Sequence, residues 1–224
     1  GKWWDLTVQF AQALRARCDG KLLIASPTLV ASLDALAALR GTQNLLVDLV
    51  MQPDKVHRAL DQITRAYAEI LAALAELLGY ESHGCINRHG MYARGPVHVP
   101  QCDFSCMISP AMFREFGIPY LRREMQALDG AEYHLDGPDA AKHLEALCEI
   151  DELDVVQWVP GDGAPSRQDW TWLYDKIDAL GKGQIRGGRP ELVKRLWGQY
   201  ASRKLFFTVG VKSRGEIEGL VEEL

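Results

Sequence analysis

Short continuous apolar runs alternate along this chain with longer stretches in which apolar residues recur every three or four positions. The longer stretches predict amphipathic helices, because that spacing places the apolar side chains on one helix face. We expect helices at 4–18, 29–39, 44–51, 54–78, 110–128, 139–150, 169–180, 190–200 and 213–224. Pro53 fits the first turn of the longest helix and Gly79 its C-cap. Pro119 predicts a break near Gly117 in the helix that follows Ser109.

The short apolar runs predict strands that are buried on both faces, as in a parallel sheet covered by helices. We expect strands at 21–25, 97–103, 131–136, 153–159, 183–186 and 204–211, with a bulge or strand end at Pro100 and a polar loop at 81–94. Strand and helix thus alternate through about six units, typical of an α/β fold. A doubly wound open sheet or a (β/α)8 barrel lacking its first strands both fit, since a closed barrel takes about 250 residues.

The chain begins and ends within expected helices, which favours the incomplete barrel. The pattern contains no linker-like segment, so we expect residues 1–224 to form a single, partial TIM-barrel domain.

Composition narrows the function classes. The 224 residues are 47% hydrophobic and carry a net charge of -5, which argues against a nucleic-acid-binding protein. No apolar run approaches the ~20 residues that a membrane span needs, and the N-terminus lacks the apolar core of a signal peptide. The five cysteines are an odd number, so we expect reduced thiols in a cytoplasmic protein. Cys102 and Cys106 alone are close in sequence, and one such pair is a weak zinc signal.

The stretch 131–138, AEYHLDGP, carries the main candidate chemistry. Residues two apart in a strand point to the same face, so His134 and Asp136 can converge on one ligand or metal ion. Gly137 and Pro138 then end the strand. The alternative is that His134 is a hydrogen-bonded core histidine and Asp136 caps the next helix.

Four stretches together resemble one family. They are CDFSCMISPAMFREFGIPYL at 102–121, YHLDGP at 133–138, LDVVQWVPGDG at 153–163 and KLFFTVGVKS at 204–213. In this order and spacing the chain is similar to the uroporphyrinogen decarboxylase superfamily, which includes corrinoid and coenzyme-M methyltransferases. The resemblance covers nearly the whole chain and implies a (β/α)8 barrel. It aligns 21–26 with about the third strand, so the first two strands would lie upstream.

The resemblance implies methyl transfer more than decarboxylation. Methyltransferases of the family bind zinc through a His-x-Cys motif and a later cysteine near the last strand. Here His134 matches the histidine, Asp136 replaces the cysteine, and the last strand has no cysteine. A carboxylate suits a harder metal than a thiolate does, so His134 and Asp136 would hold zinc, another divalent metal, or none. No catalytic residue of the decarboxylases can be transferred to this chain.

Two other functions stay open. One is tetrapyrrole decarboxylation as in porphyrin biosynthesis, which needs no metal. The other is a non-catalytic binding relative. We further expect a small-molecule substrate, a corrinoid protein or thiol as partner, a possible homodimer, and no activity from this chain by itself.

A barrel gathers its chemistry at the carboxyl ends of its strands. That rule selects Asp103, His134 and Asp136 as catalytic residues, with His134 and Asp136 also as metal ligands. Substrate-binding candidates are Cys106, Gln157, Trp158 and Gln184, and Arg186, Gly210 and Lys212 lie at comparable positions. Three of these residues also have purely structural alternatives: Asp103 as a turn cap, Gln157 as a buried amide, and Trp158 as part of the core packing. His57 and His143 are expected on helix surfaces, and a metal site of His83, Cys85 and His89 matches no standard spacing.

Overall fold

The computed structural model describes residues 1–18, 20–161, 169–200 and 204–224. The chain begins with five helices. They are α1 (Lys2–Cys18), α2 (Ser32–Arg40), α3 (Thr42–Met51), α4 (Pro53–Leu78) and α5 (Tyr80–His83). A two-stranded hairpin follows, formed by β1 (Cys85–Ile86) and β2 (Tyr92–Ala93), which pair antiparallel.

Strands and helices alternate through the rest of the chain. The strands are β3 (Val97–His98), β4 (Gly130–Asp136), β5 (Val155–Val159), β6 (Gly183–Gly188) and β7 (Leu205–Val209). Between and after them lie the 3-10 helices η1 (Asp103–Met107) and η2 (Ala141–His143), and the helices α6 (Pro110–Phe116), α7 (Ile118–Met125), α8 (Leu144–Cys148), α9 (Thr171–Ala179), α10 (Pro190–Gln199) and α11 (Arg214–Glu223).

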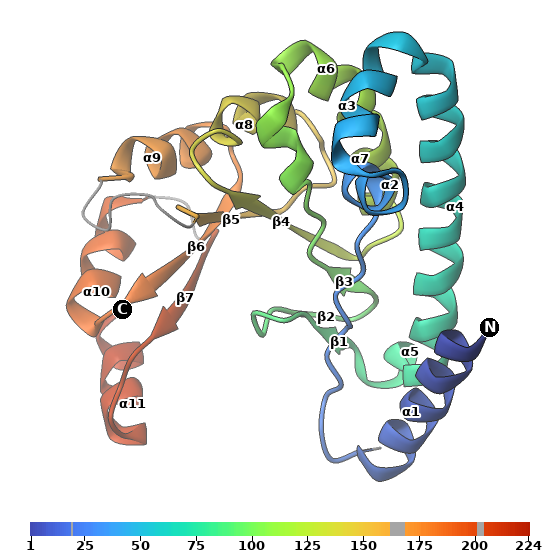
Figure 1. Ribbon diagram of the computed structural model, residues 1–224. Helices are drawn as coiled ribbons and strands as arrows, with labels where there is room; N and C mark the ends of the chain where they lie inside the picture. Colours follow the sequence, from blue (N-terminus) through green and yellow to red (C-terminus); the bar gives the residue numbers. More distant parts are fainter. Residues whose placement is uncertain (19, 162–168, 201–203) are drawn as a thin grey trace.

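The five strands β3 to β7 form one parallel sheet in the order of the sequence. The sheet curls into half of a barrel, with helices on its outside (Figure 1). This confirms the expected α/β class and the parallel sheet. The strand order β3-β4-β5-β6-β7 has no reversal, which excludes the doubly wound alternative for the described residues, because a doubly wound sheet changes direction at a switch point.

Two local expectations were wrong. Residues 21–25 do not form a strand, since only Ala25 makes an isolated parallel bridge, to Ile86. The segment 81–94 is not a plain loop, because it contains most of α5 and the β1–β2 hairpin. Both segments depend on each other: the Ser26 amide donates to the Ile86 carbonyl at 2.8 Å. Such long-range pairing leaves no periodic trace in the sequence.

Other boundaries follow local chemistry. Gly79 ends α4 in the left-handed conformation, at φ 71°, as a C-cap glycine should. The helix after Ser109 is interrupted at Gly117, two residues before Pro119, and Ser109 caps its start by accepting from the Met112 amide. The expected helix at 139–150 is instead a 3-10 turn followed by the short α8. The strand expected at 97–103 is shorter, because β3 ends at His98, two residues before Pro100, although Gln101 still bridges to His134.

The two faces of the sheet have different partners. The outer face carries Tyr133, Leu135, Val156 and Trp158, which are buried in the main apolar core. The same core includes side chains of α2 to α4 and α6 to α9, and each large side chain buried there contributes roughly 1.5–3 kcal/mol. No helix among the described residues is long and apolar enough to cross a membrane.

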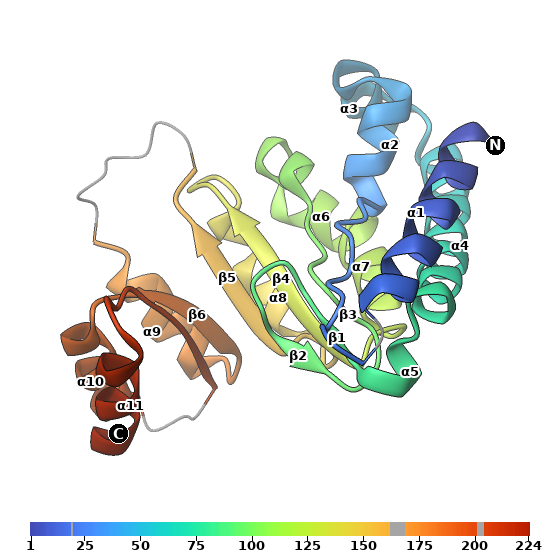
Figure 2. The same cartoon turned by 90° about the horizontal axis from the view of Figure 1, so that it is seen from below.

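The inner face carries the alternate residues of the same strands. Because side chains alternate along a strand, it includes Glu132, His134, Asp136, Gln157, Ile185 and Phe206. The β1–β2 hairpin lies against β4 on this side (Figure 2). The main core therefore packs against the outer face, and the polar side chains of β4 and β5 that share one face lie on the inner side.

Candidate metal centre on the inner face

Three side chains converge at the carboxyl end of β4. Asp103, His134 and Asp136 each offer one ligand atom, and these atoms lie within 4.8 Å of one another. His134 and Asp136 are two residues apart in β4, and Asp103 comes from η1, which follows the neighbouring strand β3. The convergence of His134 with Asp136 is the geometry that the strand period predicts, and Asp103 joins them because parallel strands end at one edge of the sheet.

A hydrogen bond orients the imidazole of His134. Its Nδ1 lies 2.6 Å from Oε1 of Gln157, which is directly opposite on β5. An amide oxygen only accepts, so Nδ1 carries the proton and Nε2 carries the lone pair. His134 is half-buried and contacts a polar neighbour, and its free lone pair is the feature that a metal ligand needs.

Asp136 has an unsatisfied oxygen. Its Oδ1 is buried and has no hydrogen-bond partner among the described residues. Asp136 does not cap the following helix, because the residue before η2 is Ala140. Gly161 approaches so closely that an added Cβ would lie 3.2 Å from Oδ1, and its φ of +76° also disfavours other residues. A buried carboxylate oxygen without a donor lacks compensation for its lost hydration, which a cation would supply.

Asp103 is held by its backbone. The amides of Asp103 and Phe104 donate to the carboxylate of Asp34 in α2, at 2.9 and 2.8 Å. Asp103 therefore begins η1, and Asp34 is the residue that caps it. Burial raises the pKa of Asp103, and the charge of Asp34 raises it further, while His134 opposes this. The Asp103 carboxylate itself accepts from the amide of Gln101 at 3.2 Å.

Sequence reasoning missed a second polar group on the same face. Glu132 is fully buried, accepts from Nδ2 of Asn87 at 2.7 Å and lies 2.6 Å from Nδ1 of His89. Burial raises the pKa of Glu132 to about 7, although Asn87 lowers it, and burial lowers the pKa of His89. The alternation Glu132, His134, Asp136 was a usable signal, because all three must share one face.

Not every expected site residue reaches the cluster. Gln157 does, through its hydrogen bond with His134. Cys106 lies half-buried in η1, the 3-10 helix that also carries Asp103, and burial raises the pKa of its thiol. Trp158 and Gln184 do not, since both lie on the outer face. Trp158 packs in the core against Trp170, with ring centroids 4.8 Å apart. These two assignments are corrected by the parity of the strands, which places neighbours of inner residues outside.

Gln184 and Arg186 serve the helix layer instead. Gln184 donates to the Tyr174 carbonyl in α9 at 3.3 Å and accepts from Arg186 at 3.1 Å. The guanidinium of Arg186 stacks on the Tyr174 ring, 3.6 Å from its centroid. Gly210 and Lys212 follow β7, where the Lys212 amide donates to Glu216 at 2.7 Å. We find no contact of these residues with the cluster among the described residues.

The histidine expectations were partly wrong. His143 is buried rather than solvated, and its Nε2 lies 2.9 Å from the Ser105 carbonyl. His57 is half-buried, stacks on Phe116 and contacts the Tyr120 hydroxyl at 2.8 Å. His89 faces Glu132 and not Cys85. In the described part of the chain, Asp103, His134 and Asp136 form the single group with metal-ligand geometry.

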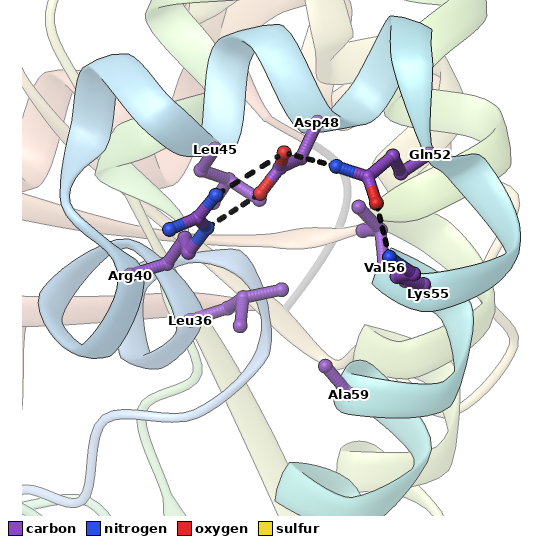
Figure 3. A pocket seen from close by; sticks show the side chains of 8 residues that line it. All are labelled: Leu36, Arg40, Leu45, Asp48, Gln52, Lys55, Val56 and Ala59. Carbon is purple, nitrogen blue, oxygen red and sulfur yellow. Dashed lines mark hydrogen bonds and ion pairs between the residues drawn. The ribbon is translucent and has the colours of Figure 1, made fainter.

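A separate pocket of about 350 Å³ lies between α2, α3 and α4. Figure 3 shows that its polar side chains pair with one another: Arg40 binds Asp48 at 2.6 Å, and Gln52 links Asp48 to Lys55. The pocket shares no residue with the cluster on the inner face. Its charged side chains already have partners within the pocket, so they are less available to bind a ligand than Asp103, His134 and Asp136 are.

The donor set of the cluster fits a divalent metal of borderline to hard character. One imidazole nitrogen and two carboxylates give a neutral sum with a divalent cation, and three protein ligands leave positions open for a substrate. The unsatisfied Oδ1 of Asp136 and the orientation of His134 by Gln157 support this fit. The set contains no thiolate, which distinguishes it from a site dedicated to sulfur-bound zinc.

Comparison with known proteins does not assign the chain to a family. No family model matches the chain. No curated protein matches it either. The structure shows an α/β chain with a parallel sheet curled into half of a barrel and a candidate Asp/His/Asp metal-ligand group at the carboxyl end of β4.

Proposed function

We propose that this chain belongs to an enzyme of the uroporphyrinogen decarboxylase superfamily and that it takes part in metal-assisted methyl transfer from a small molecule to a corrinoid or thiol partner. One observation carries the proposal: Asp103, His134 and Asp136 bring their ligand atoms within 4.8 Å of one another. The half-barrel sheet and the family-like stretches at 102–121 and 133–138 support it. Barrel enzymes carry their chemistry at this end of the strands.

Each residue has a role in this proposal. Asp103, His134 and Asp136 bind the metal ion, and Gln157 keeps the lone pair of His134 on Nε2. The bound metal would act as a Lewis acid on the oxygen or sulfur atom that carries the methyl group. The methyl group leaves without the bonding electron pair, which stays on that atom, and the nucleophile of the partner supplies the pair for the new bond. Burial raises the pKa of the Cys106 thiol, which does not favour the thiolate form that a nucleophile needs.

The replacement of a family cysteine by Asp136 favours an oxygen donor over a thiol as the bound substrate. Carboxylate ligands leave more positive charge on the metal than thiolates do, and a harder metal polarises oxygen more effectively. The tetrapyrrole decarboxylase alternative requires no metal and makes no use of a convergent Asp/His/Asp group.

Metal binding by the purified chain tests the proposal. We expect one divalent ion per chain by elemental analysis after incubation with Mn²⁺ or Zn²⁺ and gel filtration. His134→Ala and Asp136→Asn should lose most of it, whereas His83→Ala, at an exposed histidine, should keep it. A parent without metal, or His134→Ala with unchanged metal content, contradicts the proposal. Chelator-resistant decarboxylation of a tetrapyrrole by a longer form of the protein would favour the alternative.

A further inference from the structure

We propose that Ser32 and Glu124 are positioning residues of the candidate metal site. Their buried contact fixes the start of α2, and α2 in turn holds Asp103 through Asp34. The inference rests on the proposed metal site and adds two residues that control its affinity without touching the metal ion. It begins from the backbone conformation of Ser32.

Ser32 has a costly backbone conformation. Its φ is +48°, and it is the one non-glycine residue with a positive φ in the part of the chain that the structure describes. Residues with a Cβ keep such a conformation only where their surroundings hold them in it. Ser32 is 0% exposed and is the first residue of α2. A buried contact must therefore stabilise the start of this helix.

That contact is a hydrogen bond with α7. The hydroxyl of Ser32 donates to Oε1 of Glu124, whose side chain is also buried. The N-cap residue of α2 is Ala31, which makes no side-chain hydrogen bond to the helix. A serine hydroxyl at a helix start usually accepts from a backbone amide of the same helix. Here the hydroxyl binds α7 instead, so the position of the start of α2 depends on Glu124.

The first turn of α2 connects this contact to the metal site. Residues two apart in a helix differ by about 200° around its axis, so Ser32 and Asp34 point in nearly opposite directions. Ser32 meets Glu124 of α7, and Asp34 accepts from the amides of Asp103 and Phe104 at 2.9 and 2.8 Å. The turn thus spans from α7 to η1, and a shift of Ser32 moves the carboxylate that holds Asp103.

The surroundings of Glu124 suit its neutral form. Burial raises the pKa of Glu124 to about 8; the hydrogen bond to Ser32 lowers it by less, and the charge of Asp34 adds to the increase. The other ionisable groups that face it are Tyr67 on α4, Cys102 before η1 and Tyr133 on β4, and burial raises the pKa of each. None of them supplies a positive charge. A charged Glu124 would therefore lose its hydration without compensation and would repel Asp34.

The positioning role predicts an unusual pH dependence of metal binding. Loss of the proton from Glu124 should loosen the start of α2 and with it Asp103, so this contribution to metal affinity falls as pH rises through about 8. Metal ligands act in the opposite direction, because they lose protons and bind more tightly as pH rises. Glu124→Gln keeps an acceptor for Ser32 and cannot ionise, so its comparison with the parent isolates the contribution of Glu124.

Calorimetric titration with Mn²⁺ at pH 6.5 and 8.5 measures this contribution. At pH 6.5 the parent and Glu124→Gln should bind Mn²⁺ equally. At pH 8.5 the parent should bind about fourfold more weakly than Glu124→Gln, because only about a quarter of the chains keep Glu124 protonated. Glu81→Gln, at an exposed glutamate, should match the parent at both values.

Two variants of Ser32 separate positioning from stability. Ser32→Ala and Ser32→Gly both remove the hydroxyl, but glycine adopts a positive φ at no steric cost. Ser32→Gly should therefore unfold at a higher urea concentration than Ser32→Ala, while both bind Mn²⁺ about fivefold more weakly than the parent at pH 6.5. Ser82→Ala and Ser82→Gly, at an exposed serine in α5, should keep the parent affinity. If Ser32→Ala does not fold, Ser32→Gly still provides the comparison.

The outcomes separate this inference from the function that it extends. A parent that binds Mn²⁺, with unchanged affinity in the folded Ser32 variants, overturns the positioning role alone. Equal affinities of the parent and Glu124→Gln at pH 8.5 overturn the role of the Glu124 charge. A parent that binds no Mn²⁺ overturns both the metal site and the inference that rests on it.

Discussion

At the scale of single residues, one hydrogen bond decides which nitrogen of His134 is available to a metal. The Oε1 atom of Gln157 accepts from Nδ1 at 2.6 Å and so leaves the lone pair on Nε2. Such partners of metal ligands typically contribute 10–100-fold to metal affinity.

Removing this partner should weaken the site without changing its ligands. We expect Gln157→Ala to lower the affinity for Mn²⁺ by about tenfold, measured by calorimetry. Gln126→Ala, at an exposed glutamine in the turn after α7, should bind Mn²⁺ as the parent does. Equal affinities in Gln157→Ala and the parent would exclude an orienting role for Gln157.

Glu124 offers a test of pH dependence away from the site. Its side chain is 2% exposed, and the hydroxyl of Ser32 donates to its carboxyl group. Burial raises the pKa of Glu124 to about 8, and the hydrogen bond to Ser32 lowers it by less. The folded chain therefore holds a proton that the unfolded chain releases between pH 4.5 and about 8.

The sign of the effect follows from proton linkage. The folded state binds more protons in this window, so the contribution of Glu124 is complete below pH 4.5 and is lost as pH rises through about 8. Glu124→Gln removes the titration. The free energy of unfolding of the parent should fall relative to this variant, by at most about 1.4 kcal/mol per pH unit.

Urea unfolding at pH 5.5, 6.5 and 7.5 measures this difference. Glu81→Gln, at an exposed glutamate, should show a constant difference from the parent across the same range. A constant difference for Glu124→Gln as well would mean that Glu124 does not titrate in the window.

At the scale of elements, helix α2 helps to position the candidate metal site, because one of its residues caps η1. Asp34 in α2 accepts from the amides of Asp103 and Phe104 and thereby begins η1. The core packs α2 against α4, so the position of Asp103 depends on a helix about 70 residues earlier in the chain.

Loss of this cap should affect both stability and metal binding. We expect Asp34→Ala to lower the free energy of unfolding by about 1 kcal/mol, the usual cost of a lost cap, and to weaken Mn²⁺ binding because Asp103 is no longer held. Asp151→Ala, at an exposed turn, serves as the control for both measurements. Reduced stability with unchanged Mn²⁺ affinity would limit Asp34 to a structural role.

At the scale of the whole molecule, the two edges of the sheet differ. The β3 edge is covered, because Ser26 donates to the Val97 carbonyl and the Leu29 amide donates to His98. No strand of the described residues pairs with the outer edge of β7, which has the sequence LFFTV. An open edge with such β-forming residues is a template for pairing with another chain.

This edge predicts self-association of the isolated chain. Sedimentation velocity over a range of protein concentrations should show reversible dimers, in line with the expected homodimer. Thr208→Lys, at an exposed position of β7, should weaken association by about tenfold, since charged residues protect sheet edges. Gln199→Lys adds the same charge at an exposed position on α10 and should not. A parent that stays monomeric at every concentration would contradict this prediction.

The sequence by itself determined the elements whose cause is local. The helical spacing, together with Pro53 and Gly79, predicted α4, and Pro119 predicted the break between α6 and α7. The short apolar runs predicted β4, β5, β6 and β7. It also determined that His134 and Asp136 share a face, because strand geometry repeats every two residues.

Only the tertiary structure decided which face meets the helices and what lies opposite it. That choice places Trp158 and Gln184 outside and Glu132 inside. The tertiary structure also decided that 81–94 contains a hairpin that contacts β4, where the sequence predicted a loop, and that 21–25 do not form a strand. The reason is physical: these features depend on contacts between residues about 20 to 70 positions apart, and no local pattern records which distant partner a segment will meet.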